Sequence, residues 1–209
     1  MIAWSIALAL LLSGQSAAGL DVDLSRYDAR ATGSINGRVV EERRKPDALD
    51  RPLLPTVVTL VPRSDAFLQR LDAVKRHARE SLAAFREAAP RLRREQGDYE
   101  RALGEAGGAQ LVRVAHVDGD GRFAFTGVPR GPWLVIAWHG VVVDVKTPAL
   151  GRRERDVFAP GERIDRYRAV TVWVTEIGVG GGVGEPLELT DRNAWFTGIL
   201  EEAKPGAGR

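Results

Sequence analysis

The 209-residue sequence contains no cysteine. This absence excludes disulfide bonds, thiolate metal sites, a cysteine nucleophile and the acylated cysteine of a lipoprotein. The folded chain must therefore be held together by packing. Its length and its 44% of hydrophobic residues are sufficient for one substantial core, so we expect a globular protein and not a disordered one.

Histidine is scarce, since only His77, His116 and His139 are present. His77 lies off the apolar stripe of a predicted helix. His116 alternates with valines, which favours a histidine that is buried or at a sheet edge with its hydrogen bonds made within the protein. His139 ends an apolar strand. A metal or catalytic pair of His116 and His139 would lack a placed carboxylate. We therefore assign no catalytic residue and no metal ligand, and we expect no cofactor.

The chain also lacks a one-sided basic region. Its 30 Lys and Arg residues are interspersed with 28 Asp and Glu residues, which leaves a formal net charge of +2. Nucleic-acid binding requires basic side chains gathered on one face or along one helix. Nucleic acid is therefore not an expected partner.

No apolar run approaches the roughly 20 residues that a membrane span requires. Residues 2–12 are apolar and small residues follow at 16–19, which is the order of a secretory signal and its cleavage site. We predict a signal peptide at residues 1–18, export to the periplasm, cell wall or medium, and no stable membrane span after cleavage. An uncleaved anchor stays open as the alternative, because no Lys or Arg precedes the apolar run.

Strand and helix patterns divide the rest of the chain. Residues 33–40 and 55–62 are short, rich in β-branched residues and bounded by Gly or Pro, so both are predicted strands. Apolar residues then recur every three or four positions from Ser64 to Ala89, which predicts a helix that Pro90 ends or separates from a successor. Strand patterns with turn residues between them resume after Gly108, as is typical of antiparallel sandwiches.

Residues 118–121, Asp-Gly-Asp-Gly, allow two interpretations. A calcium loop that began at Asp118 would need an oxygen ligand at its fifth position and a Glu at its twelfth, where the sequence has Arg122 and Pro129. A tight hairpin turn needs residues that tolerate positive φ, which these glycines supply. We therefore predict a hairpin, with Phe123 and Phe125 on one face of its second strand.

Three segments carry a family resemblance: "GSINGRVV", "PTVVTLVP" and "DGDGRFAFTGVPRGPWLVIAW". Together they resemble the carboxypeptidase-regulatory-like domain family, and the resemblance implies a transthyretin-like (Ig-like) β-sandwich. An insertion of about fifty residues and a long C-terminal part depart from the family pattern. The positions that match the motif are Gly33, Gly37, Asp118, Gly119, Asp120, Gly121, Phe123, Phe125, Pro129 and Gly131.

The predicted fold is mainly β: an antiparallel transthyretin-like sandwich with a helical insertion between its second strand and the hairpin at 118–121. The predicted organisation is a signal peptide at 1–18, a leader at 19–32, the sandwich at 33–177 with the insertion at 64–107, a Gly-rich loop at 178–185, and an extended segment with a tail at 186–209.

Enzyme motifs are absent from the sequence. The chain has no Gly-x-Ser-x-Gly elbow, the glycines of 178–184 fit neither nucleotide fingerprint, and the C-terminus lacks the Tyr-Arg-Gly-Ser motif of transthyretin-type hydrolases. The His-x-His pair of intradiol dioxygenases is missing too. We expect a non-enzymatic binding or structural module whose partner is a protein or a carbohydrate; the alternative is a hydrolase or peptidase-associated enzyme with an unrecognised site.

Two apolar surfaces need an explanation. Alternation places Thr171, Trp173 and Thr175 on one face of a strand, which is a candidate ligand surface unless another segment covers Trp173. The strand at 133–138 is apolar on both faces, so we expect a second layer of the protein to cover the face that does not point into the sandwich. We expect the helical insertion to supply that cover; a projecting helical arm that binds a partner protein is the alternative.

Overall fold

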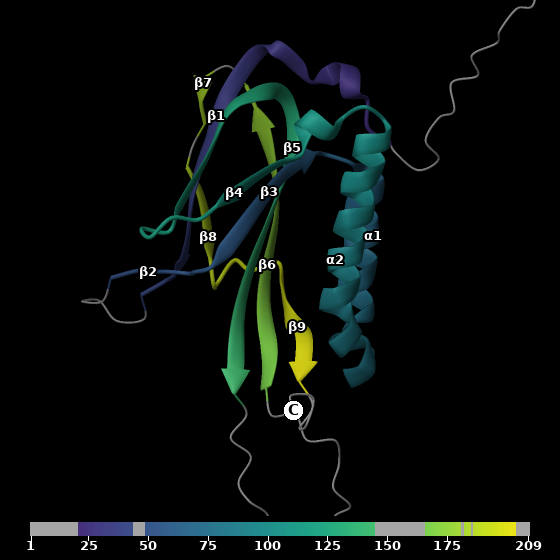
Figure 1. The fold of residues 1–209 in the computed structure, drawn as a ribbon, viewed down its shortest axis with the longest axis vertical. Helices are drawn as coiled ribbons and strands as arrows, with labels where there is room; N and C mark the ends of the chain where they lie inside the picture. The colour runs from purple at the N-terminus through teal and green to yellow at the C-terminus, as the bar shows by residue number, and fades with distance from the viewer. Residues whose placement is uncertain (1–20, 44–48, 145–165, 181, 185, 204–209) are drawn as a thin grey trace, which may run out of the picture.

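The computed structural model describes residues 21–43, 49–144, 166–180, 182–184 and 186–203, so the predicted signal peptide at 1–18 lies outside the described residues (Figure 1). The elements, in chain order, are η1 (Leu24–Arg26), β1 (Asp28–Glu41), β2 (Arg51–Pro52), β3 (Thr56–Pro62), α1 (Asp65–His77), α2 (Leu82–Glu105), η2 (Ala109–Leu111), β4 (Arg113–His116), β5 (Arg122–Asp144), β6 (Arg166–Val179), β7 (Gly182–Val183), β8 (Leu187–Thr190) and β9 (Phe196–Ala203).

Two sheets share the long strand β5. The first sheet contains β1, β2, β7, β8 and the first part of β5; the second contains β3, β4, β6, β9 and the rest of β5. The prediction of a mainly β fold is confirmed. The prediction of wholly antiparallel sheets is wrong for β7 and β8, which pair in parallel with β1. The transthyretin-like topology stays a prediction.

Strand β5 runs continuously from Arg122 to Asp144 and includes the predicted strand at 133–138. The chain bends at residues 129–131 and does not reverse there. Strand β1 pairs with β5 before this point, and β3 and β6 pair with it after the bend. The bend carries the strand from the first sheet into the second. One continuous strand therefore supplies side chains to both layers.

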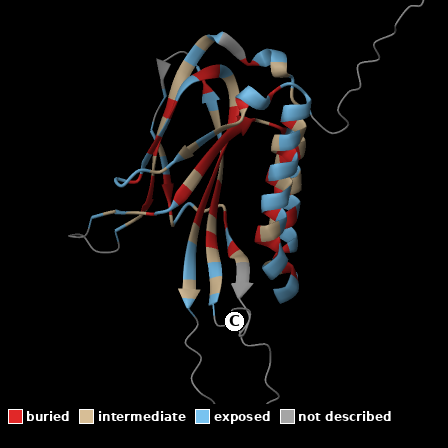
Figure 2. Ribbon diagram, in the orientation of Figure 1, coloured by how far each residue is buried: buried red, intermediate tan, exposed pale blue. Residues whose placement is uncertain are grey.

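An inner core lies between the two sheets. Trp133, Val135 and Ala137 of β5 point into it and are fully buried. Figure 2 shows buried residues concentrated along the central strands. Phe123 and Phe125 also belong to this core, which confirms that they share one face. Burial of these apolar side chains holds the two sheets together. The main contributors from the other strands are Ile35, Val39, Val58, Leu60, Trp173 and Leu189.

An outer core lies between the second sheet and the two helices. Leu134, Ile136 and Trp138 point away from the inner core and pack against the helical insertion. The prediction that the insertion covers the outer face of this sheet is confirmed, and Figure 1 shows both helices lying along it. The helical side of this core is made by Phe67, Leu71, Val74, Ala78, Ala88, Ala89, Leu92, Tyr99 and Leu103.

The insertion divides at a different point from the predicted one. The helices separate between Ala78 and Ser81, and Pro90 lies inside α2. Ser81 begins α2 because its side chain accepts a hydrogen bond from the backbone N–H of Ala84 at 3.0 Å. A proline inside a helix costs about 3 kcal/mol. Buried neighbours such as Ala89 and Leu92 anchor both sides of Pro90 to the sheet and offset this cost.

Both ends of the described chain extend the sandwich beyond its predicted limits. The strand β1 begins at Asp28, inside the predicted leader, and the hydroxyl of Tyr27 donates a hydrogen bond to the Pro132 carbonyl at 2.6 Å. At the other end, β8 joins the first sheet and β9 joins the second. The described helices include none that is long and apolar enough to cross a membrane.

Candidate functional site

A surface hollow lies beside the turn at residues 118–121. It is a groove of about 530 Å³ on the outer surface of the sandwich. Strand β1, the end of β4, the turn, the start of β5 and the residue that leads into β8 all contribute to it. Its lining consists of Asn36, Gly37, Arg38, His116, Asp118, Arg122, Phe123, Ala124 and Pro186.

The turn itself is closed by the side chain of Asp118. One carboxylate oxygen accepts hydrogen bonds from the backbone N–H groups of Asp120 at 3.0 Å and Arg122 at 2.8 Å. Gly121 has a φ of 80° and donates its N–H to the carbonyl of Asp118 at 3.0 Å. The predicted tight turn with positive φ is confirmed at this glycine.

The flanking strands do not form the predicted hairpin. Strand β4 pairs with β3 in the second sheet, whereas the start of β5 pairs with β1 in the first. The turn therefore passes the chain from one sheet to the other. The two strands diverge after the turn because each has a different ladder partner, and the groove lies at this corner of the sandwich.

Gly37 lines the groove, and no larger residue fits at its position. A Cβ at this position would lie 2.5 Å from the ring of Phe123 and 2.6 Å from the Leu187 carbonyl oxygen. The aromatic ring therefore lies against bare backbone of the neighbouring strand, a cross-strand arrangement that stabilises the pairing of β1 with β5. The motif glycine thus has a packing role beside the groove.

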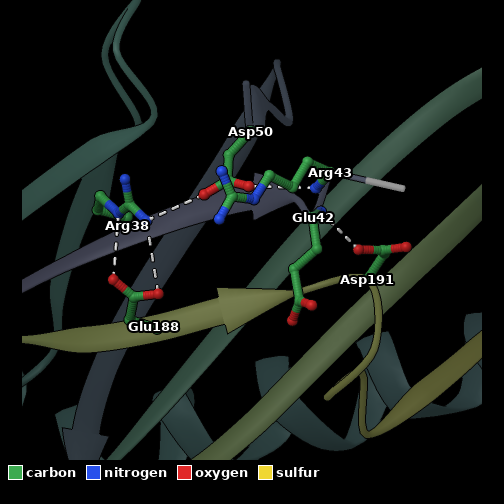
Figure 3. A network of polar contacts seen from close by, with 6 residues as sticks. All are labelled: Arg38, Glu42, Arg43, Asp50, Glu188 and Asp191. Carbon is green, nitrogen blue, oxygen red and sulfur yellow. Dashed lines mark hydrogen bonds and ion pairs between the residues drawn. The ribbon is translucent and has the colours of Figure 1, made fainter. Parts of the chain in front are cut away.

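Arg38 and Arg122 face each other directly across the ladder of β1 and β5. Like charges in this position destabilise a sheet. Arg38 is compensated, since its guanidinium pairs with Glu188 at 3.2 Å and with Asp50 at 3.4 Å (Figure 3). In the described part of the chain, Arg122 has no corresponding acidic partner, and its side chain is exposed.

The network around Arg38 fixes this edge of the groove. Asp50 also accepts a hydrogen bond from the backbone N–H of Arg43 at 3.1 Å, and Asp191 accepts one from the backbone N–H of Glu42 at 2.8 Å (Figure 3). Exposed ion pairs of this kind add little stability, about 0–1 kcal/mol each. Their effect here is positional: they hold the Arg38 guanidinium at a defined place beside the groove.

Trp173 lies in the inner core and not at the surface. Its side chain is 0% exposed in the inner core, and its indole N–H donates to the Thr190 carbonyl at 2.8 Å. The hypothesis of a ligand surface formed by Thr171, Trp173 and Thr175 is therefore wrong. The first sheet covers this face of β6, and the alternative, a Trp covered by another segment, is confirmed.

The three histidines lie in different places. His77 pairs with Glu80 at 2.7 Å on the helical side, and exposed His116 lies at the end of edge strand β4 in the groove. His139 is buried and lines a different hollow, so it does not meet His116. Among the described residues, no group of three or more His, Asp or Glu side chains is placed to hold a metal ion.

His139 has a defined hydrogen-bonding state. Its Nδ1 lies 3.1 Å from both the Pro55 carbonyl oxygen and the Thr56 hydroxyl. A carbonyl only accepts, and the Thr56 hydroxyl donates to the Leu53 carbonyl at 2.6 Å, so Nδ1 carries the proton. Burial lowers the pKa of His139; the hydrogen bond to Pro55 opposes this lowering, and the charge of Arg51 adds to it.

The geometry defines a helix-covered β-sandwich with a groove of mixed polar and apolar lining at one corner. No protein-family model and no curated protein matches the chain. Among solved structures, it is similar to a "putative carbohydrate binding protein" from Pseudomonas aeruginosa, with 15% identity and a TM-score of 0.46 over 81% of this chain and 97% of that one. It is also similar to the pilus backbone protein of Streptococcus pneumoniae, with 15% identity and a TM-score of 0.25 over 70% of this chain and 33% of that one.

Proposed function

We propose that this protein is a non-enzymatic binding module that takes a carbohydrate in the groove beside the 118–121 turn. The observation that carries the proposal is the pair of opposed arginines, Arg38 and Arg122. A like-charge pair across a ladder costs stability. Because Arg38 is already paired with acidic side chains, the exposed guanidinium of Arg122 is the cation that a ligand would engage.

The groove offers donors and acceptors in the mixture that sugar hydroxyl groups require. The amide of Asn36 can donate and accept, the guanidinium of Arg122 donates, and the imidazole of His116 can do either. One oxygen of Asp118 has two backbone donors, and its second oxygen can accept from a ligand. Rigid strands on both sides hold these groups, which reduces the entropy lost on binding.

The alternative function, an enzyme, needs a general acid or base held by a partner group. In the described residues, His116 is the histidine of the groove, and its ring donates no hydrogen bond to a carboxylate that would orient it. A binding role places no such demand on it. This comparison favours a binding module over a hydrolase.

Binding of soluble oligosaccharides tests the proposal. We expect at least one member of a panel of neutral oligosaccharides to bind, with Arg122→Ala and Asn36→Ala each weakening binding about tenfold, which is the loss of one or two hydrogen bonds. Arg130→Ala, at an exposed position later in β5, is the matched control and should bind like the wild type. Unchanged binding in both groove variants would contradict the site, and cleavage of the bound glycan would favour the enzyme.

Export belongs to the same proposal. It rests on the apolar run at 2–12 and the small residues at 16–19. The mass of the intact protein recovered from outside the cytoplasm should correspond to a chain that begins at or near Gly19. Recovery of residues 1–18 with the membrane fraction would instead identify an anchored module.

A further inference from the structure

A second hollow lies where the turn between the helices meets the start of β9. Its volume is about 250 Å³, and it shares no residue with the groove at the 118–121 turn. In Figure 1, the helices and β9 lie on the opposite side of the molecule from β1 and β8. The lining consists of Lys75, Ala78, Arg79, Phe85, Ala194, Trp195, Phe196 and Thr197.

Backbone hydrogen bonds fix the walls of this hollow. On the helical side, the N–H of Arg79 donates to the Arg76 carbonyl at 3.1 Å, and that of Glu80 donates to the His77 carbonyl at 3.0 Å. On the strand side, the N–H of Trp195 donates to the Val172 carbonyl at 2.9 Å. The hollow is therefore framed by ordered segments and does not have to form when a ligand arrives.

One wall is aromatic and partly open to solvent. The Trp195 and Phe196 rings lie 6.4 Å apart, and Phe196 is buried while Trp195 remains partly exposed. Phe85 of α2 is also partly exposed. A flat aromatic face provides a large apolar contact at a low cost in conformational entropy. Such a face suits the apolar side of a ring-shaped ligand.

The charges on the lining are all of one sign. Lys75 and Arg79 are cationic, and no acidic side chain contributes to the lining. Lys75 lies over the ring of Trp195, with its ammonium nitrogen 4.5 Å from the ring centroid. An ammonium group has three donors, so Lys75 can contact the ring and still donate to an anion. The nearby carboxylate of Glu80 is engaged by His77 at 2.7 Å.

We propose that this hollow binds a small acidic sugar, that is, a single hexose ring carrying one carboxylate. The volume lies below the roughly 300–1,000 Å³ of pockets for drug-sized ligands, which favours one ring over a longer glycan. Lys75 and Arg79 take the carboxylate, the partly exposed side chains of Phe85 and Trp195 contact the apolar side of the ring, and the exposed hydroxyl of Thr197 bonds a ring hydroxyl.

Titration of the full exported chain with glucuronate tests this site. NMR of the tryptophan indole N–H groups should show saturable shifts, among them that of Trp195. Glucose and acetate at equal concentrations should give no saturation, because each supplies only one half of the recognition. If glucose binds with the same affinity as glucuronate, the proposed role of the cations is wrong. If acetate binds with the same affinity as glucuronate, the proposed role of the sugar ring is wrong.

Variants locate the binding. Lys75→Gln removes the charge and keeps most of the side-chain length, and we expect it to weaken glucuronate binding at least tenfold. Arg76→Gln, one position along α1 and exposed outside the hollow, is the matched control and should bind like the wild type. Equal affinities of these two variants, or no saturable binding by the wild type, would overturn the proposal.

Independence from the proposed function can be measured in the same titration. Arg122→Ala lies in the other groove and should leave glucuronate binding unchanged. A loss of glucuronate binding in Arg122→Ala with retention in Lys75→Gln would assign the sugar to the first groove and overturn the second site. Loss of neutral oligosaccharide binding alone would leave the acidic-sugar site intact.

Discussion

At the scale of single residues, Gly121 sets the geometry of the corner between the sheets. Its φ of 80° is a conformation that side chains rarely adopt, and a Cβ there would lie 3.0 Å from the Val39 carbonyl oxygen. We expect Gly121→Val to lower the free energy of unfolding by about 1–3 kcal/mol. The matched control is Gly119→Val, because a Cβ at Gly119 meets nothing within 4 Å; it should cost less than about 0.5 kcal/mol.

Urea denaturation of both variants, with and without millimolar calcium, measures these effects. Calcium should leave the stability of every form unchanged, because Asp118 already uses one oxygen to close the turn and Arg122 and Pro129 occupy the positions of missing ligands. Equal losses in the two glycine variants would contradict the role of Gly121. A calcium-dependent rise that Asp120→Ala abolishes would contradict the turn interpretation.

Trp173 shows what alternation can predict for one residue. The pattern correctly separates Trp173 from Val170 and Val172, which point toward the helices. It could not show that the first sheet covers the Trp173 face, because that cover comes from segments distant in the sequence. The buried Gln96 is a similar case: its side-chain oxygen accepts from the indole N–H of Trp138 at 2.7 Å, a pairing that no local pattern reveals.

At the scale of elements, the helical insertion supplies more than half of the buried residues of the outer core. Deletion of residues 64–107 with a short Gly-Ser bridge is geometrically feasible, since Leu60 of β3 and Arg113 of β4 are directly paired. The deletion would expose the apolar outer face of the second sheet. We expect the product to aggregate or to melt at a much lower temperature, measured by calorimetry and sedimentation.

Two leucines of α2 provide the matched control for that experiment. Leu92 is 1% exposed and faces the sheet, whereas Leu82 is 67% exposed. Leu92→Ala should lower the free energy of unfolding by about 2–5 kcal/mol, and Leu82→Ala by less than about 0.5 kcal/mol. A soluble deletion product of nearly native stability, or equal losses in the two leucine variants, would contradict a stabilising cover.

The helical stripe was predictable because its period is local, but the helix ends were not. By its spacing, Leu82 belongs to the apolar stripe predicted for a single continuous helix, but its side chain is exposed to solvent. The reason is that the helix breaks at residues 79–81, so α2 begins with a different rotation about its axis. Pro90 is a strong local stop signal that tertiary packing overrides. Similarly, Gly131 and its neighbours bend β5 where local rules favour a turn.

At the scale of the whole molecule, the pairing of β8 and β9 with the two sheets was not predicted. β1 pairs with β8, which lies about 150 residues away in the chain, and β9 joins the outer edge of β6. Short extended segments such as 187–190 carry no signal of their partner. Consequently the predicted C-terminal limit of the sandwich at residue 177 is too early. The two-layer fold with its helical cover could still be predicted, from the strand and helix periods of the apolar residues and from the two apolar faces of the strand at 133–138.

The stability of the whole molecule should depend on pH through His139. Its folded-state pKa lies below the ordinary value of 6.5, because burial disfavours the charged ring. As the pH falls through about 6.5, the unfolded chain therefore binds a proton that the folded chain does not yet bind, and the free energy of unfolding decreases. The stabilising effect is complete above this pH and is lost toward the lower folded-state pKa.

Urea midpoints at about pH 7.5, 6.5 and 5.5 should decrease in that order for the wild type and for His116→Gln. They should decrease less for His139→Gln, which cannot take up this proton; an equal decrease in both variants would place the proton uptake elsewhere.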